Sequence, residues 1–559
     1  MLRIAAALAL ASLLVPIAAA PADSPQTPQI HVATRLVEVG VIVRDKNGPV
    51  ANLTKNDFVI LDRGKPQPIS IFTVADASTQ QPQLREPPQP LPRNTFSDLP
   101  QYGAAAPRSV TVVLLDNLNT LYGSAPQSKY EKTPFWVEDL ALQNAKQHLL
   151  QFINELQPQD RVAIYALRNG LYVLCDFTND RDQLLSIVKN YDATSMTNRQ
   201  VVEPGDMTMR MPGHDSAGED AFGQGSGFEN GASSRLAAAA NEDRAGQTMA
   251  ALQQIAAHVA NIPGRKNLVW LTANLPFSGA AMAHVLSPAN IAVYPVDARG
   301  LLASAPTVAI GAWGTADFDD VSGASGHMDN MPGQSDQPIG ITTMQNLADD
   351  TGGQAFVNTN DITGAIRKAV EDSAVTYTLG FYIDREALDG KFHELKVEVK
   401  RSGLTLRYPK GYFAFPDAAP TKGEDQIHLL SAVRSPIESS LIPLQATLAR
   451  VDQPQPNSLS LSCSIDIHNL QLAQSGHLHK GAVIVYVIEQ DQTGKVVYQW
   501  QKGYDFQITD PQYAALLKSG MMFHQYLHPK ADVTTVRVLV EDASTNQLGS
   551  LIIPLSQIN

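Results

Sequence analysis

The run from Ser109 to Thr120, Ser-Val-Thr-Val-Val-Leu-Leu-Asp-Asn-Leu-Asn-Thr, constrains the fold of this chain more than any other segment. Its apolar residues are consecutive rather than alternating, which is typical of a parallel strand that is covered on both faces. In open α/β sheets, ligands bind just beyond the carboxyl ends of such strands. Because Asp116 ends the apolar run, we expect it to lie where a cation or a polar ligand is held.

Length and charge limit the classes of protein that fit this chain. With 559 residues the chain is too long for a single hydrophobic core, and roughly three or four domains are expected. A hydrophobic content of 44% with a charged content of 17% is typical of folded, soluble protein. The net charge of −13, without a dense stripe of Lys and Arg, argues against nucleic acid or an anionic membrane as a partner.

The N-terminus has the pattern of a secretory signal peptide. Arg3 supplies a positive charge, residues 4–20 form an apolar and small-residue run, and residues 18–22 offer small side chains for cleavage. An uncleaved anchor is the alternative, although about 17 residues is short for spanning a bilayer. We predict a signal peptide over 1–22 and a mature protein that is secreted, periplasmic or in the cell envelope, with no integral membrane segment.

Patterns of hydrophobicity divide the rest of the chain into four parts. Strands alternate with helices after the linker, which predicts a mostly parallel sheet with helices on both faces. Short strands separated by turns at the end of the chain predict a β-sandwich. The predicted parts are an N-terminal β module (30–75), a Pro/Gln-rich linker (76–108), an α/β domain (109–413) with polar insertions near 199–244 and 303–340, and a C-terminal β-sandwich (425–559).

Several motifs in a fixed order resemble a known family. They are Leu36-Val-Glu-Val, Val43-Arg-Asp with Gly48, Leu53-Thr with Asp57-Phe58, Leu114-Leu-Asp-Asn-Leu-Asn-Thr120, Pro263-Gly-Arg-Lys-Asn-Leu-Val-Trp270, Tyr377-Thr-Leu-Gly-Phe-Tyr382, Gly390-Lys-Phe-His393 and Lys410-Gly-Tyr412. Together they resemble the bacterial, acidobacterial-type group of von Willebrand factor A-related proteins over residues 30–413. The resemblance implies a Rossmann-like A domain that serves adhesion or protein assembly.

Many A domains hold Mg²⁺ in a metal-ion-dependent adhesion site, which a carboxylate of the partner completes. The first element of that site is Asp-x-Ser-x-Ser. Asp116 and Thr120 match it, Leu118 replaces the first hydroxyl, and Asn119 offers an amide oxygen from a neighbouring position. The alternative is structural: Asp116, Asn119 and Thr120 accept hydrogen bonds from backbone amides of the loop and the next helix.

The remaining elements of the adhesion site are incomplete in this sequence. Thr194 or Thr197 could supply the threonine of the later loop, but Ala273 stands where the third element has an acid. Leu118 and Ala273 cannot ligate a hard cation, which takes oxygen ligands. We therefore expect a degenerate site at Asp116, Asn119, Thr120 and Thr194, with no cofactor as the main prediction and Mg²⁺ or Ca²⁺ as the alternative.

Other candidate residues are isolated in the sequence. The acidic run Asp317–Asp320 is a candidate for Ca²⁺ or simply a solvated loop, and His477 with His479 has no neighbouring acid or cysteine to complete a metal site. Cys175 and Cys463 are expected to be buried thiols, with a disulfide between them as the alternative. The sequence has no His-Glu-x-x-His, Gly-x-Ser-x-Gly or phosphate-loop motif.

The sequence thus predicts an exported, non-catalytic binding protein. Its partner would be a protein or a cell-surface ligand, contacted by the loops above the sheet and by the two insertions. Two other functions stay open: an extracellular hydrolase, which would need a deep pocket with a perturbed carboxylate or histidine, and a purely structural envelope component.

Overall fold

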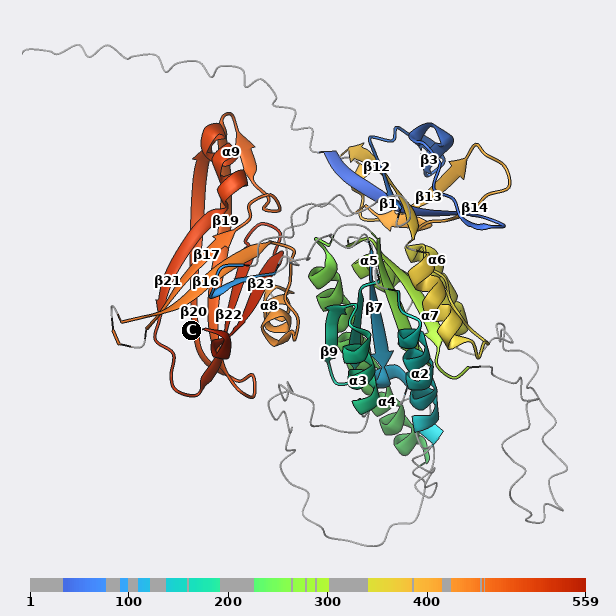
Figure 1. Cartoon of the computed structure of the whole chain (residues 1–559), viewed down its shortest axis with the longest axis horizontal. Helices are drawn as coiled ribbons and strands as arrows, with labels where there is room; N and C mark the ends of the chain where they lie inside the picture. Colours follow the sequence, from blue (N-terminus) through green and yellow to red (C-terminus); the bar gives the residue numbers. More distant parts are fainter. Residues whose placement is uncertain are drawn as a thin grey trace, which may run out of the picture.

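The computed structural model describes most of the chain after residue 33 as three packed bodies (Figure 1). The described ranges are 34–76, 91–98, 109–120, 137–157, 160–191, 226–262, 265–276, 279–286, 289–300, 340–372, 374–384, 387–414, 424–452, 455–456 and 458–558. The predicted signal peptide, Thr194 and the run Asp317–Asp320 lie outside these residues.

The first body is a β module built from two distant stretches of sequence. One sheet has the order β14-β1-β12-β5 with β2 beside β1, and the other has the order β15-β13-β3-β4. Alternating apolar residues of both sheets meet in one core. The strands are β1 (Thr34–Asp45), β2 (Gly48–Pro49), β3 (Phe58–Asp62), β4 (Lys65–Gln67), β5 (Ile71–Asp76), β12 (Val375–Asp384), β13 (Phe392–Val399), β14 (Thr405–Arg407) and β15 (Gly411–Phe413).

The second body is a five-stranded sheet of order β11-β10-β7-β8-β9, between two layers of helices. Its strands are β7 (Ser109–Asp116), β8 (Val162–Leu167), β9 (Leu171–Thr178), β10 (Arg265–Thr272) and β11 (Ile291–Asp297). One layer holds α2 (Val137–Asn154), α3 (Arg181–Asn190) and α7 (Ile362–Glu371). The other holds α4 (Ser226–Val259), α5 (Gly279–Leu286) and α6 (Ile341–Thr351).

The predicted fold class is wrong for the chain as a whole, which consists mostly of antiparallel and mixed β sheets. Only β11, β10, β7 and β8 pair in parallel, and the other pairings between described strands are antiparallel. The error concerns mainly β12, which follows a helix and therefore looked like one more parallel strand. It pairs instead with β1, antiparallel over eight positions. Alternation with helices cannot show which distant strand a new strand will join.

The third body consists of two antiparallel sheets over one apolar core. The first sheet contains β6 (Thr95–Ser97), β16 (Leu444–Val451), β17 (Ser458–Ile465) and β21 (Met521–Leu527). The second contains β18 (Ala473–Ser475), β19 (Leu478–Asp491), β20 (Val496–Thr509), β22 (Val533–Asp542) and β23 (Leu548–Pro554). β6 comes from the segment that was predicted as a linker, and it pairs with the edge of β16.

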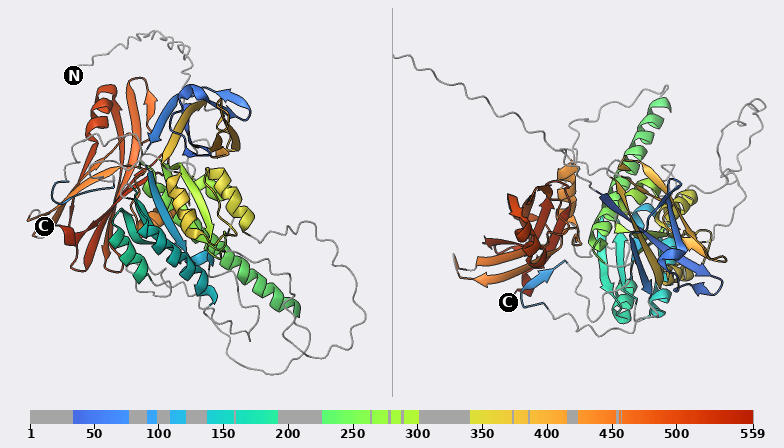
Figure 2. Two further views of the ribbon diagram at one scale, coloured as in Figure 1. Left: turned by 45° about the vertical axis from the view of Figure 1, so that its right-hand side comes forward. Right: turned by 90° about the horizontal axis from the view of Figure 1, so that it is seen from above.

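Two helices accompany these sheets. α8 (Glu424–Arg434) packs between the second sheet and α4, and α9 (Asp510–Ser519) follows β20. Figure 2 shows the third body beside the helices of the parallel sheet, and α4 projecting beyond that sheet. None of the helices in the described part of the chain is long and apolar enough to cross a membrane.

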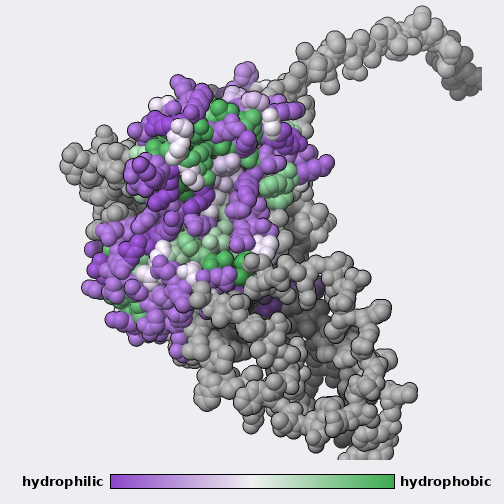
Figure 3. Space-filling model, turned by 90° about the vertical axis from the view of Figure 1, so that its right-hand side faces the viewer, coloured by the Kyte–Doolittle hydropathy of each residue, from purple (hydrophilic) through white to green (hydrophobic). Residues whose placement is uncertain are grey.

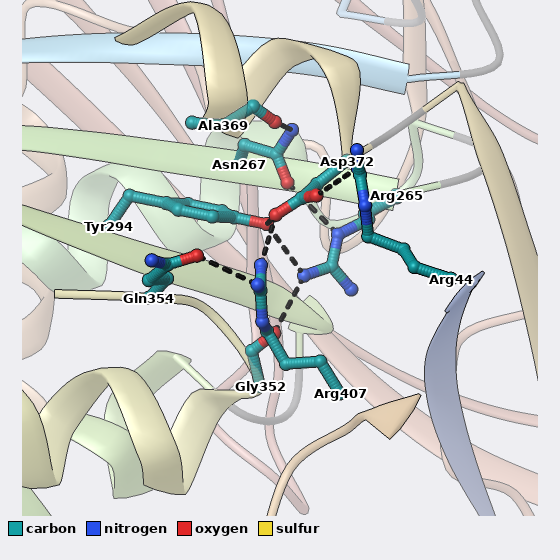
Figure 4. Close-up of polar contacts among 9 residues, drawn as sticks. All are labelled: Arg44, Arg265, Asn267, Tyr294, Gly352, Gln354, Ala369, Asp372 and Arg407. Atoms are coloured by element: carbon teal, nitrogen blue, oxygen red, sulfur yellow. Dashed lines mark hydrogen bonds and ion pairs between the residues drawn. The ribbon is translucent and has the colours of Figure 1, made fainter. Parts of the chain in front are cut away.

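A buried ion-pair network joins the β module to the end of the sheet at which its parallel strands begin, called the amino edge from here on (Figure 4). The carboxylate of Asp372, at the end of α7, is fully buried and accepts hydrogen bonds from Arg44 of β1 at 3.0 Å, from Arg407 of β14, and from the Tyr294 hydroxyl at 3.2 Å. Arg265 donates to the same hydroxyl at 3.1 Å and to the Gly352 carbonyl at 2.9 Å. The Asp372 carboxylate thus receives hydrogen bonds from groups of both the β module and the parallel-sheet body.

Replacing Asp372 by Asn should lower the free energy of unfolding by about 3 kcal/mol, because removing one partner of a buried ion pair leaves the arginines without a counter-charge. The change is measured as a loss of thermal stability. Asp384→Asn, at an exposed position of the same module, is the control and should change stability by less than about 0.5 kcal/mol. Equal stability of the two variants would contradict the role given to Asp372.

Asp98 should make the stability of the C-terminal body depend on pH. It accepts a hydrogen bond from the Leu444 amide at 2.8 Å, while its second oxygen is buried without a partner among the described residues. Burial raises the pKa of Asp98 to about 9. Between pH 4 and pH 9 the unfolded chain loses a proton that the folded chain retains, so stability falls as pH rises, by up to about 1.4 kcal/mol per pH unit.

Asp98→Asn should remove this contribution. The melting temperatures of wild type and variant are measured between pH 5 and pH 9. As pH rises, the melting temperature of wild type should fall relative to that of the variant. Asp532→Asn, which changes an exposed carboxylate, should follow the wild-type curve. Parallel curves for wild type and Asp98→Asn would show that Asp98 is ionised in the folded protein.

Candidate functional site

The ends of the parallel strands bring polar side chains to the carboxyl edge of the sheet. Asp116 ends β7, Thr272 ends β10 and Asp297 ends β11, and all three are buried. Strands that run in the same direction end at the same edge, so the sequence expectation for Asp116 correctly located this edge.

The carboxylate of Asp116 is engaged by protein donors. It accepts hydrogen bonds at 2.9 Å from the backbone amide of Asn119, from the Asn119 side-chain amide and from the indole N–H of Trp270. Burial raises the pKa of Asp116 above its usual value, and these hydrogen bonds act in the opposite direction. The contacts tie the short helix after β7, α1 (Asn117–Thr120), to the neighbouring strand β10, which corresponds to the structural alternative that the sequence left open.

Asn119 lies beside Asp116, as the sequence suggested, but it presents its amide nitrogen. The same nitrogen donates to the Thr248 hydroxyl of α4 at 3.0 Å, and that hydroxyl donates to the Arg244 carbonyl at 2.8 Å. The amide oxygen of Asn119 is buried and has no partner among the described residues. An amide nitrogen cannot ligate a cation, so this arrangement fits a hydrogen-bond network better than a metal site.

The other predicted metal positions are apolar, outside the described residues, or described by backbone only. Leu118 is buried in the core on the α4 side of the sheet, and Ala273 is buried at the end of β10. Thr120 ends the short helix α1 (Asn117–Thr120), and Thr194 lies outside the described residues. Within the described part of the chain, no group of three or more His, Cys, Asp or Glu side chains is placed to hold a metal ion.

The sequence reading missed an ion pair at the same edge. Asp297 accepts from the Arg299 guanidinium at both oxygens, from Nε at 2.9 Å and from Nη2 at 2.8 Å. Asp297 is buried, whereas the Arg299 side chain is 29% exposed. A guanidinium has five N–H groups, and among the described residues only Asp297 accepts from that of Arg299, which leaves three N–H groups for solvent or a ligand. Asp297 follows an apolar strand as Asp116 does, and that signal could have identified it.

A second acid that the sequence reading missed lies beside the two histidines of the C-terminal body. Asp510 accepts from His477 Nδ1 at 2.8 Å and from His479 Nε2 at 2.9 Å, and these hydrogen bonds lower its pKa. The ring of Tyr513 stacks on His479 at 4.3 Å. Each carboxylate oxygen already contacts one ring, so the cluster fixes the start of α9 against β19.

Both cysteines are free and buried, as expected. Burial raises the pKa of Cys175 to about 11 and that of Cys463 to about 12. At neutral pH both are thiols rather than nucleophilic thiolates.

Comparisons with known proteins supply similar structures only. No family model and no curated protein matches the sequence. Among solved structures, an aerotolerance-related membrane protein from Bacteroides fragilis is 12% identical, and the conserved hypothetical protein BatB from Bacteroides thetaiotaomicron is 13% identical. Each match covers 47% of this chain and 98% of the other, with a TM-score of 0.24. Similarity at this level identifies neither a function nor a site.

Asp116→Ala should lower the free energy of unfolding by about 2 to 4 kcal/mol, because it leaves the Trp270 indole and the Asn119 amide without an acceptor. Thermal unfolding measures the loss.

The melting temperature of wild type should be the same in EDTA and in excess Mg²⁺ or Ca²⁺, since a ligand that binds only the folded state would raise it. A rise with metal that Asp116→Ala abolishes would establish a cation site instead.

Proposed function

We propose that this chain is an exported, non-catalytic binding protein that contacts a protein partner at the carboxyl edge of the parallel sheet. The observation that carries this proposal is Arg299, whose guanidinium is held by buried Asp297 while part of the side chain remains exposed. A positioned guanidinium binds carboxylates well, because its N–H groups match their geometry. The partner would therefore present an acidic side chain.

The packing of the three bodies supports this choice of surface. The β module covers the amino edge of the sheet through Asp372, and the C-terminal body packs along α4. The face formed by the β module and the helices below it is mostly hydrophilic, with hydrophobic areas interrupted by polar ones (Figure 3).

The sequence motifs support the same class of function. The resemblance to von Willebrand factor A-related proteins implies adhesion or assembly, and the pattern of residues 1–22 implies export. In the adhesion site of that family a metal ion bridges to a partner carboxylate. Here Arg299 would provide the positive charge at that edge, and no divalent cation would be required.

The proposal is tested by capture of proteins from a solubilised envelope fraction on the immobilised full chain, followed by quantification of the retained proteins. We expect a set of proteins that wild type retains equally in EDTA and in Mg²⁺. Arg299→Gln should retain about tenfold less of this set, as loss of one partner in an interfacial charge pair weakens binding strongly.

Two controls separate this effect from damage to the fold. Lys396→Gln removes an exposed cation from β13, in the β module, and should retain the set like wild type. Arg299→Lys keeps the positive charge but loses the paired N–H groups that match a carboxylate, so it should retain an intermediate amount of these proteins. Equal retention by wild type and a folded Arg299→Gln variant would refute the carboxyl edge as the binding surface.

A further inference from the structure

A pocket with a volume of about 400 Å³ lies where the C-terminal body packs on the parallel-sheet body. Its walls are α4 and α5 on one side, and α8 with the turn between β22 and β23 on the other. Pockets of this size at the junction of two bodies are common sites for small ligands. Its lining does not include Arg299, so the pocket is separate from the proposed partner surface.

The wall of the pocket combines aliphatic side chains with polar ones, and one of the polar side chains is acidic. Ala256, Ala257 and Ala260 line it from the α4 side, and Ile437 and Leu441 line it from the C-terminal body. Among the described lining residues Glu438 is the only acid, and the other titratable groups are His284 and His428. Burial lowers the pKa of His284, which disfavours a positive charge on this ring.

Glu438 is held in place by contacts with both bodies. One carboxylate oxygen accepts from the Ile552 amide at 2.8 Å, and the Glu438 carbonyl accepts from His258 Nδ1 at 2.8 Å. The titratable groups near its carboxyl group are His258 on α4, Asp176 on β9, Arg537 on β22 and Asp98. Arg537 is directed to the carbonyls of Ala432 and Ser435 rather than to Glu438.

We propose that this pocket binds a small organic cation with an aliphatic body, whose charged end contacts the Glu438 carboxylate and whose aliphatic part lies against the alanines of α4. Among the described residues the Glu438 carboxylate accepts only from the Ile552 amide, and Arg537 donates to carbonyls instead, so a cation that enters the pocket gives this carboxylate a direct ionic contact. The aliphatic wall favours a ligand with an apolar body for the same reason that apolar surface is buried in folding.

The test uses three probes of equal chain length, namely hexylammonium, hexanol and hexanoate, with binding to the full chain measured by calorimetry at pH 8. The pKa of Glu438 is raised by burial to about 7, so the carboxyl group is mostly ionised at this pH. Hexylammonium should bind most tightly and hexanoate least. Glu438→Gln should weaken hexylammonium binding about tenfold and leave hexanol binding unchanged.

Ala257→Leu fills the pocket from α4 and should abolish binding of hexylammonium and hexanol without changing Glu438. Asp532→Asn removes an exposed acid of the same body and should bind like wild type. The proposal is overturned if wild type does not bind hexylammonium, if hexanoate binds equally well, or if hexylammonium binds a folded Glu438→Gln or Ala257→Leu variant as tightly as wild type.

Discussion

The ion pairs of Asp372 with Arg44 and Arg407 determine how the central part of this protein is assembled. Asp372 ends a helix of the parallel-sheet body, whereas the two arginines belong to strands of the β module. A buried carboxylate is stable only when positive groups balance its charge, and here the positive groups belong to a different body. The β module is thereby fixed on the amino edge of the sheet, which leaves the carboxyl edge for Asp116, Asp297 and Arg299.

The two sheet edges therefore have different roles. At the amino edge polar groups satisfy one another, from Arg265 through Tyr294 to Asp372. At the carboxyl edge the Asp116 carboxylate likewise accepts hydrogen bonds from protein donors. Arg299 differs, because its guanidinium is held by the buried Asp297 carboxylate while part of its side chain remains exposed. This contrast is the physical basis for placing a partner at Arg299 rather than at Asp116.

Local patterns predicted local structure well. The apolar run that ends at Asp116 is a buried strand that pairs in parallel with both of its neighbours, as its uninterrupted apolar pattern indicated. Pairing between distant strands was not predictable, because β12 carries no local mark that it will join β1. The same limit hid the site residues: Trp270, which binds Asp116, is 154 positions away, and Asp510 is 31 positions from His479.

The coupling between Arg44 and Asp372 tests this account most directly, because the two residues are 328 positions apart in sequence. The free energy of opening of β1 can be measured by native-state hydrogen exchange in wild type, Arg44→Gln, Asp372→Asn and the double variant. We predict a coupling energy of about 1 to 3 kcal/mol. Additive effects of the two substitutions would contradict the central claim that this ion pair fixes the β module on the parallel sheet.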